Sequence, residues 1–135
     1  MGKPVTKRIT NTEKVHPTNG TWAQCTRKGN LLFISGQTAF NANSEIIGKG
    51  NFEIQAKQAF DNLVALLEAG GSSLEDLMMI TVFVTNMANR PLLVKIQDKY
   101  FRNNPPASTL VEIKRLVDDE LLIEINGIAV LENDS

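Results

Sequence analysis

Hydrophobic residues recur with a helical period in two segments of the chain. Between residues 52 and 69 the apolar positions fall at helical spacing, and Gly70-Gly71 ends the segment as glycines commonly end helices. These positions are Ala56, Phe60, Leu63, Val64 and Leu67. A second helix is predicted over residues 92–101, and Pro105-Pro106 stops it. Its apolar positions are Leu93, Ile96 and Tyr100.

Five further segments are predicted to be strands, from alternating polar and apolar residues or from a short apolar run, and a polar leader precedes them. The predicted strands cover residues 22–28, 31–35, 78–85, 109–116 and 121–131. Gly29-Asn30 is predicted to be the turn of a hairpin, and Asp118-Asp119-Glu120 the turn between the last two strands. A chain of 135 residues suffices for one ordinary domain, so residues 1–135 are predicted to form a single domain.

The two long strands predict different environments for their two faces. One parity of each strand is apolar and suits packing under the helices: Met78, Ile80, Val82 and Val84, then Ile123, Ile125 and Ala129. The other parity is half-apolar: Met79, Thr81, Phe83 and Thr85, then Leu122, Glu124, Asn126, Ile128 and Val130. Two helices cover only one side of a sheet, so the other side is expected to pack against copies of the same chain.

A candidate pocket lies where an apolar strand gives way to small polar residues. Leu31-Leu32-Phe33-Ile34 suits a strand buried on both faces, and Ser35-Gly36-Gln37 follows it directly. A glycine here would let a ligand approach the backbone, although a simple turn at Ser35-Gly36 is the favoured alternative.

Glu124 is the best candidate for a general acid or base. A carboxylate partly buried at an interface between chains has a raised pKa, which brings it toward the range of proton exchange. The alternative is a solvated glutamate, or one paired with Lys114 or Arg115 on the neighbouring strand.

Composition narrows the classes of partner. The 14 basic and 15 acidic residues are mixed along the chain, so no basic stripe for nucleic acid or polybasic membrane anchor is present in the sequence. No apolar run has the length of a membrane span, and Met1-Gly2-Lys3-Pro4 lacks the apolar core of a secretory signal. We therefore expect a cytoplasmic protein that has neither a nucleic acid nor a membrane as its partner.

One cysteine and one histidine exclude a structural zinc site of the usual kind. Cys25 lies in a strand that reads as half-exposed, and His16 precedes Pro17 in an expected loop. An inert thiol and a solvated histidine are the favoured interpretations over a catalytic Cys-His pair.

Six short segments, in order, resemble the reactive intermediate deaminases (RidA/YjgF), once described as translation initiation inhibitors. They are Gly20-Thr21-Trp22, similar to Gly-Pro-Tyr; Phe33-Ile34-Ser35-Gly36-Gln37, similar to the strand ending in Ser-Gly-Gln; Gln58-Ala59-Phe60-Asp61-Asn62-Leu63, similar to Gln-x-x-x-Asn-Leu; Val82-Phe83-Val84, similar to the central strand; Pro106-Ala107-Ser108-Thr109-Leu110-Val111-Glu112, similar to Pro-Ala-Arg-x-x-Val-Glu; and Glu124-Ile125-Asn126-Gly127-Ile128-Ala129, similar to Glu-Ile-Glu-x-Ile-Ala.

The resemblance implies an α+β fold like that of chorismate mutase, with a mixed sheet, two helices on one face, and a homotrimer around a central barrel. In active members, clefts between subunits hydrolyse imines or enamines of amino acids to keto acids and ammonia, without a metal or an organic cofactor. The signature arginine binds the substrate carboxylate, and a glutamate matching Glu124 positions or activates water.

The chain departs from that pattern at three positions. Ser108 stands at the signature arginine and cannot make a bidentate, charge-assisted clamp. Val94 stands where many members have asparagine, and Trp22 replaces the early tyrosine. Losing the clamp alone would weaken carboxylate binding by about 10- to 100-fold. Arg27, Arg102 or Arg115 of a neighbouring subunit would restore it by entering the cleft.

Two functions remain open. The first is a cofactor-independent deaminase-type hydrolase with a shifted small-molecule substrate, with Glu124 as base, Ser35, Gly36 and Ser108 lining the cleft, and Trp22 and Tyr100 as its walls. The second is a non-catalytic trimer that binds a metabolite or a protein in the same clefts. RNA cleavage, attached to some L-PSP relatives, is disfavoured by the near-neutral charge and the lack of a paired His or Lys.

Overall fold

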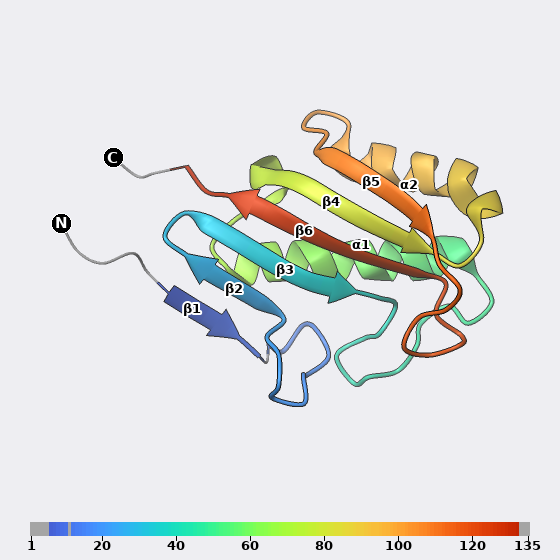
Figure 1. Ribbon diagram of the computed structural model, residues 1–135, viewed down its shortest axis with the longest axis horizontal. Helices are drawn as coiled ribbons and strands as arrows, with labels where there is room; N and C mark the ends of the chain where they lie inside the picture. The colour runs from blue at the N-terminus through green and yellow to red at the C-terminus, as the bar shows by residue number, and fades with distance from the viewer. Residues whose placement is uncertain (1–5, 11, 133–135) are drawn as a thin grey trace.

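The computed structural model describes residues 6–10 and 12–132, which form one mixed sheet with two α-helices (Figure 1). The strands are β1 (Thr6–Ile9), β2 (Cys25–Lys28), β3 (Leu31–Gln37), β4 (Leu77–Val84), β5 (Ala107–Glu112) and β6 (Ile123–Val130). Their order is β1-β2-β3-β6-β4-β5, and only the β4–β5 pair is parallel. The α+β class is therefore confirmed.

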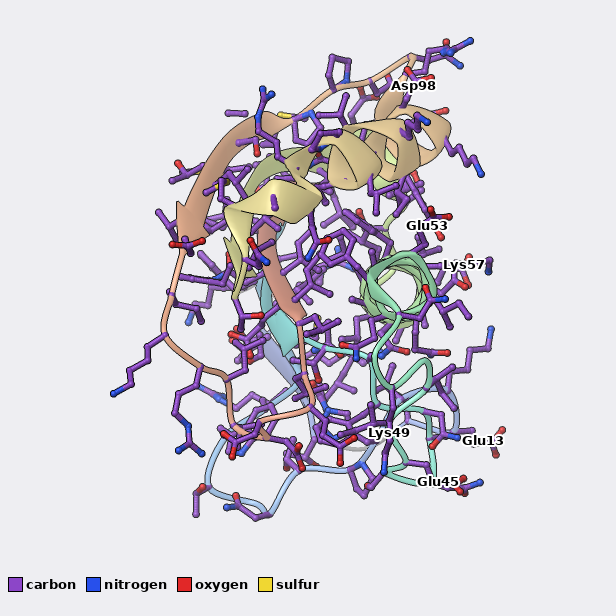
Figure 2. All side chains as sticks on the ribbon, turned by 90° about the vertical axis from the view of Figure 1, so that its right-hand side faces the viewer. Glu13, Glu45, Lys49, Glu53, Lys57 and Asp98 are labelled. Atoms are coloured by element: carbon purple, nitrogen blue, oxygen red, sulfur yellow. The ribbon has the colours of Figure 1, made fainter. Side chains whose placement is uncertain are left out.

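Both helices, α1 (Phe52–Ala69) and α2 (Arg90–Phe101), lie on the same side of the sheet, as the edge-on view in Figure 2 shows. The Asn51 side chain caps α1 by accepting the Ile54 N–H at 3.1 Å. Asn86 caps the short 3₁₀ turn η2 (Met87–Asn89) that leads into α2. A second 3₁₀ turn, η1 (Leu74–Asp76), precedes β4.

The helix predictions hold closely, and the strand predictions hold with shifted ends. α1 occupies the predicted residues, and α2 starts two residues early because Pro91 fits the first turn of a helix. The strand predicted over 22–28 begins only at Cys25, and β5 spans 107–112 rather than 109–116. The Gly29-Asn30 hairpin is confirmed, with Gly29 at a φ of 59°.

Strand β1 was missed, because residues 6–9 lie at the sheet edge and are mostly exposed. A strand with little burial on either face shows no apolar alternation, so the segment reads as a polar leader. The prediction made for residues 1–4 lies outside the described residues.

The core lies between the helices and one face of the sheet. Ile123, Ile125 and Ala129 of β6 point into it, as predicted. Met78 does not, which corrects the predicted apolar parity of β4: it is 49% exposed, and Leu77 is buried instead. The pairing of β4 with β6 shifts between Leu77 and Met79, and such a bulge reverses the parity of the residues on either side.

The other face of the sheet, called the open face below, is covered by no helix in the described residues (Figure 2). Its large apolar side chains come from four strands: Leu31, Phe33, Met79, Phe83, Val111, Ile128 and Val130. Leu31 and Phe33 are 40% and 44% exposed, so the prediction that residues 31–34 are buried on both faces is wrong for the single chain. Only Leu32 and Ile34 enter the core.

In the segments 6–10 and 12–132, neither helix is long and apolar enough to cross a membrane.

Candidate functional site

Glu124 lies on the open face, in the middle of the sheet, with its carboxylate over Gly36. A Cβ atom added to Gly36 would lie 2.5 Å from Cδ and from Oε2 of Glu124, so a larger residue here would push the carboxylate out of its present position. The glutamate is half-buried, and burial raises its pKa above 4.5. The pairing of β3 with β6 thus holds the Glu124 carboxylate in a half-buried position, where it takes up a proton more readily than an exposed glutamate.

Glu124 makes no ion pair and no side-chain hydrogen bond with any residue that the structure describes. Arg115 pairs with Asp119 at 3.2 Å instead, and Lys114 lies beyond the end of β5. The alternative in which Lys114 or Arg115 neutralises Glu124 is therefore wrong for the single chain.

Ser35 and Gly36 belong to strand β3 and not to a turn. The pairing with β6 is irregular between Ile34 and Gln37, so two residues of β3 leave the regular ladder beside Glu124. The Ser35 hydroxyl donates to the Ala23 carbonyl at 2.6 Å. Its proton is committed, so toward a ligand Ser35 offers lone pairs as an acceptor.

A buried chain of amides supports this end of β3, and it was not predicted as part of the site. Gln37 Nε2 donates to Gln24 Oε1 at 2.7 Å, and Gln24 Nε2 donates to the His16 carbonyl at 2.7 Å. Gln37 Oε1 is buried without a hydrogen-bond partner among the described residues. The Ser-Gly-Gln motif was the sequence signal for this part of the site. Its glutamine, Gln37, donates to Gln24 and to the Ser35 carbonyl, and so stabilises the end of β3 without contacting Glu124.

Trp22 lies in the loop before β2 and is exposed, next to the Ala23 that accepts the Ser35 hydroxyl. The His16 ring packs 6.3 Å from the Trp22 ring and 5.1 Å from that of Phe40, both distances between centroids. His16 is therefore half-buried, not solvated as expected, and burial lowers its pKa below 6.5.

Cys25 faces the core and is fully covered. Burial raises the pKa of its thiol to about 11, which leaves almost no thiolate near neutral pH. The prediction of an inert thiol is confirmed in this respect.

Ser108 lies in a different place, in a hollow of about 320 Å³ between strand β5 and helix α2. The hollow is lined by Ile80, Val94, Gln97, Asp98, Phe101, Arg102, Pro105, Pro106 and Ser108. Ser108 pairs with the core-facing Ile80, so its side chain is on the helix side of the sheet.

The single chain does not bring Ser108 and Glu124 together. Strand β4 lies between β5, which carries Ser108, and β6, which carries Glu124. Ser108 pairs with Ile80 of β4, whereas Glu124 pairs with Phe83, three residues further along. These offsets place the two Cα atoms about 14 Å apart, with side chains on opposite faces. Of the predicted site residues, Ser35, Gly36 and Glu124 therefore form one group, Trp22 precedes the Ala23 that is bonded to Ser35, and Ser108 lies apart.

Tyr100 belongs to neither group. Its ring stacks on Phe60 at 5.0 Å between centroids, and its hydroxyl donates to Asp61 Oδ1 at 2.7 Å. Burial and the neighbouring Asp61 raise its pKa far above its usual range. In the single chain Tyr100 ties α2 to α1 and does not reach Glu124.

Two of the resembling segments carry structural residues. Asn62 donates to the carbonyls of Thr38 and Phe40 at 3.0 and 2.8 Å, and so holds the long loop before α1. Glu112 accepts the Met87 N–H at 2.8 Å and fixes the start of η2.

Comparison with known proteins gives consistent results. The family model described as Endoribonuclease L-PSP matches residues 13–131. The chain is 36% identical to a RutC family protein of Pyrococcus horikoshii over 93% of this chain and 99% of that protein. It is 29% identical to a 2-iminobutanoate/2-iminopropanoate deaminase of Dermatophagoides farinae, over 93% and 98%. The crystal structure of the YjgF gene product from E. coli superposes with a TM-score of 0.82 at 30% identity, over 92% of this chain and 98% of that one. The chain belongs to the RidA/YjgF family.

Proposed function

We propose that this protein is a cofactor-independent hydrolase of small imines or enamines, with Glu124 as the general base. The observation that carries the proposal is the half-buried Glu124 carboxylate over Gly36, which has no ion-pair partner among residues 6–10 and 12–132 and whose pKa is raised by burial. The deaminase name of the Dermatophagoides relative supports the reaction class.

The proposed reaction is hydrolysis of a C=N bond. Glu124 takes one proton from a water molecule as the water oxygen adds to the imine carbon, and it passes this proton to the nitrogen to give a carbinolamine. Glu124 then takes the remaining hydroxyl proton and returns it to the nitrogen as the C–N bond breaks, so ammonia leaves, the carbonyl product forms and Glu124 is again ionised. The net change is addition of one water and release of one ammonia, with no change of oxidation state.

We further propose a homotrimer in which the open faces meet around a central barrel. The apolar residues of the open face, including Phe33 and Ile128, support burial against other chains. The separation of Ser108 from Glu124 supports clefts between subunits, since a cleft completed by a neighbouring copy would use both groups.

Within such a cleft, Ser35, Gly36 and Trp22 would line the base, and Ser108 would line the facing wall. Ser35 would accept a hydrogen bond from a substrate N–H. Because Ser108 supplies no guanidinium, we propose a substrate preference different from that of members with the signature arginine.

The test is release of ammonia and keto acid from imines that an amino acid oxidase generates in place from several amino acids. General-base catalysis contributes about 10²- to 10⁴-fold, so Glu124→Gln is expected to lose that much of kcat. Glu53→Gln is the matched control, since Glu53 lies on α1 on the helical side of the molecule (Figure 2).

Activity that survives in Glu124→Gln would overturn the assignment of the base. No activity in the wild type, together with tight binding of a small metabolite, would favour the non-catalytic trimer that loss of the signature arginine also suggests.

A further inference from the structure

A guanidinium group lines the same hollow as Ser108. Arg102 follows the last residue of α2, and its side chain reaches the hollow between Val94, Pro105 and Ser108. The hollow that contains Ser108 therefore has no arginine on strand β5, but it has one at the end of helix α2.

The other arginines considered as replacements are engaged elsewhere. Arg27 Nε donates to the Gly29 carbonyl at 2.8 Å, and its Nη1 donates to the Gly70 carbonyl at 3.1 Å. These bonds hold it against the end of α1, on the helical side. Arg115 pairs with Asp119 in the loop after β5. Neither lines the hollow that contains Ser108.

Arg102 is held by Asp98, one helical turn earlier, which also lines the hollow. Its Nε donates to Asp98 Oδ1 at 3.2 Å, and its Nη2 donates to Asp98 Oδ2. The side chains are 73% and 48% exposed, and exposed pairs of this spacing contribute little stability because water solvates both charges well. A ligand carboxylate can therefore replace Asp98 at little cost, with the same two-pronged geometry.

We propose that Arg102 is the carboxylate-binding residue of this protein's cleft, and that Asp98 occupies its guanidinium when no ligand is bound. The inference rests on the proposed function, because the bound carboxylate would belong to the substrate or product of the same cleft, held from the helix end and not from the strand. The Gln97 amide and the Ser108 hydroxyl add neutral donors, and Ile80, Val94 and Phe101 form an apolar wall for a short aliphatic side chain.

Two substitutions should change carboxylate affinity in opposite directions. Arg102→Met removes the guanidinium but keeps an unbranched apolar stem, so the Kd for 2-oxobutanoate should rise by about 10- to 100-fold. Asp98→Asn removes the competing carboxylate, so the same Kd should fall by about 2- to 5-fold. A structural role for the pair would shift both variants in the same direction.

The experiment is titration calorimetry of the full-length protein with 2-oxobutanoate and with its amide, which lacks the charge. The amide should bind all variants equally. Arg115→Met is the matched control, because Arg115 also pairs with an aspartate four residues away but lies outside the hollow. Unfolding temperatures of the variants establish that each is folded.

Unchanged 2-oxobutanoate binding in Arg102→Met, a loss confined to Arg115→Met, or no binding of 2-oxobutanoate by the wild type would overturn this inference. Those results would leave the proposed hydrolase standing if imines are still turned over and Glu124→Gln is inactive. Conversely, carboxylate binding that depends on Arg102 without imine turnover would support the inference and overturn the proposed function.

Discussion

The Glu124 region and the Ser108 hollow differ in how the fold builds them. Glu124 sits on β6, with β3 on one side and β4 on the other, and its carboxylate occupies the space over Gly36. The hollow lies between the edge strand β5 and the last turns of α2, where Ser108, Asp98 and Arg102 are all exposed. One group is fixed by the central pairing of the sheet, and the other is carried on surface positions.

This difference bears on which part of the site can change. A side chain added at Gly36 displaces the Glu124 carboxylate directly, because its Cβ would lie 2.5 Å from that group. Exchanging an exposed residue such as Ser108 removes no core contact and typically changes stability by less than about 0.5 kcal/mol. The resemblance to the family persists at Gly36 and Glu124, and it breaks at Val94 and Ser108 in the hollow and at Trp22 in the loop before β2.

The largest effect is expected from a charge on the open face. If the two regions meet only when chains associate, Ile128→Asp would place an unpaired carboxylate at each subunit contact, at a cost of several kcal/mol per charge. Sedimentation should then show monomer in place of trimer, and imine hydrolysis should be lost. Ile54→Asp is the control, since Ile54 is similarly exposed on α1, and its mass should not change. A trimeric Ile128→Asp variant would contradict the assigned interface.

Two glycines offer the next comparison, one on each face of the sheet. In Gly36→Ala the new Cβ displaces the Glu124 carboxylate, and a shift of about 1 Å at a catalytic group can cost about 100-fold in kcat. In Gly127→Ala the Cβ lies 2.8 Å from Leu77 Cδ1 in the core, so about 1–3 kcal/mol of unfolding free energy should be lost instead. Kinetics and chemical denaturation of both variants separate the effects; a large stability loss in Gly36→Ala would argue against an open site there.

The raised pKa of Glu124 predicts how both activity and stability change with pH. Because its pKa is raised above 4.5, kcat/KM should climb with pH through that raised pKa as the base ionises. Stability has the opposite sign: the unfolded chain releases this proton first, so the free energy of unfolding should fall between 4.5 and the raised pKa. The free energy of unfolding of Glu124→Gln should follow that of the wild type below pH 4.5, and it should become relatively higher as the pH rises through the raised pKa. Parallel curves for the two proteins would contradict a raised pKa.

The sequence predicts those elements whose burial produces a clear period. α1 and the parity of β6 follow from residues such as Phe60, Leu63 and Ile125, which are fully buried on one side. β1 gives no such signal at the sheet edge, and Met78 misleads because a bulge interrupts the alternation without leaving a mark in the residue types.

The candidate site is predictable only in its parts. The motifs identify Gly36, Glu124 and Ser108, but strand order and register decide which of them are neighbours. That β4 separates β6 from β5, with Ser108 and Glu124 on opposite faces, depends on long-range pairing that no local pattern encodes. The place of Arg102 is hidden for the same reason, since it lines the hollow only because α2 packs beside β5.

The smallest effect is expected at Tyr100, which tests whether the helical layer belongs to either region. Tyr100→Phe keeps the stacking on Phe60 and removes the hydrogen bond to Asp61, so about 1 kcal/mol of unfolding free energy should be lost. Because the hydroxyl is committed to Asp61, kcat and KM should stay at wild-type values. Asp61→Asn retains an acceptor for the hydroxyl and serves as the control; it also removes the exposed Lys57–Asp61 ion pair at 2.7 Å, which contributes little, so its loss of stability should be smaller. A clear rise in KM for Tyr100→Phe, with stability unchanged, would instead make Tyr100 a wall of the cleft, as the sequence suggested. The part of the site that is built on surface positions would then extend from the hollow onto the outer surface of α2.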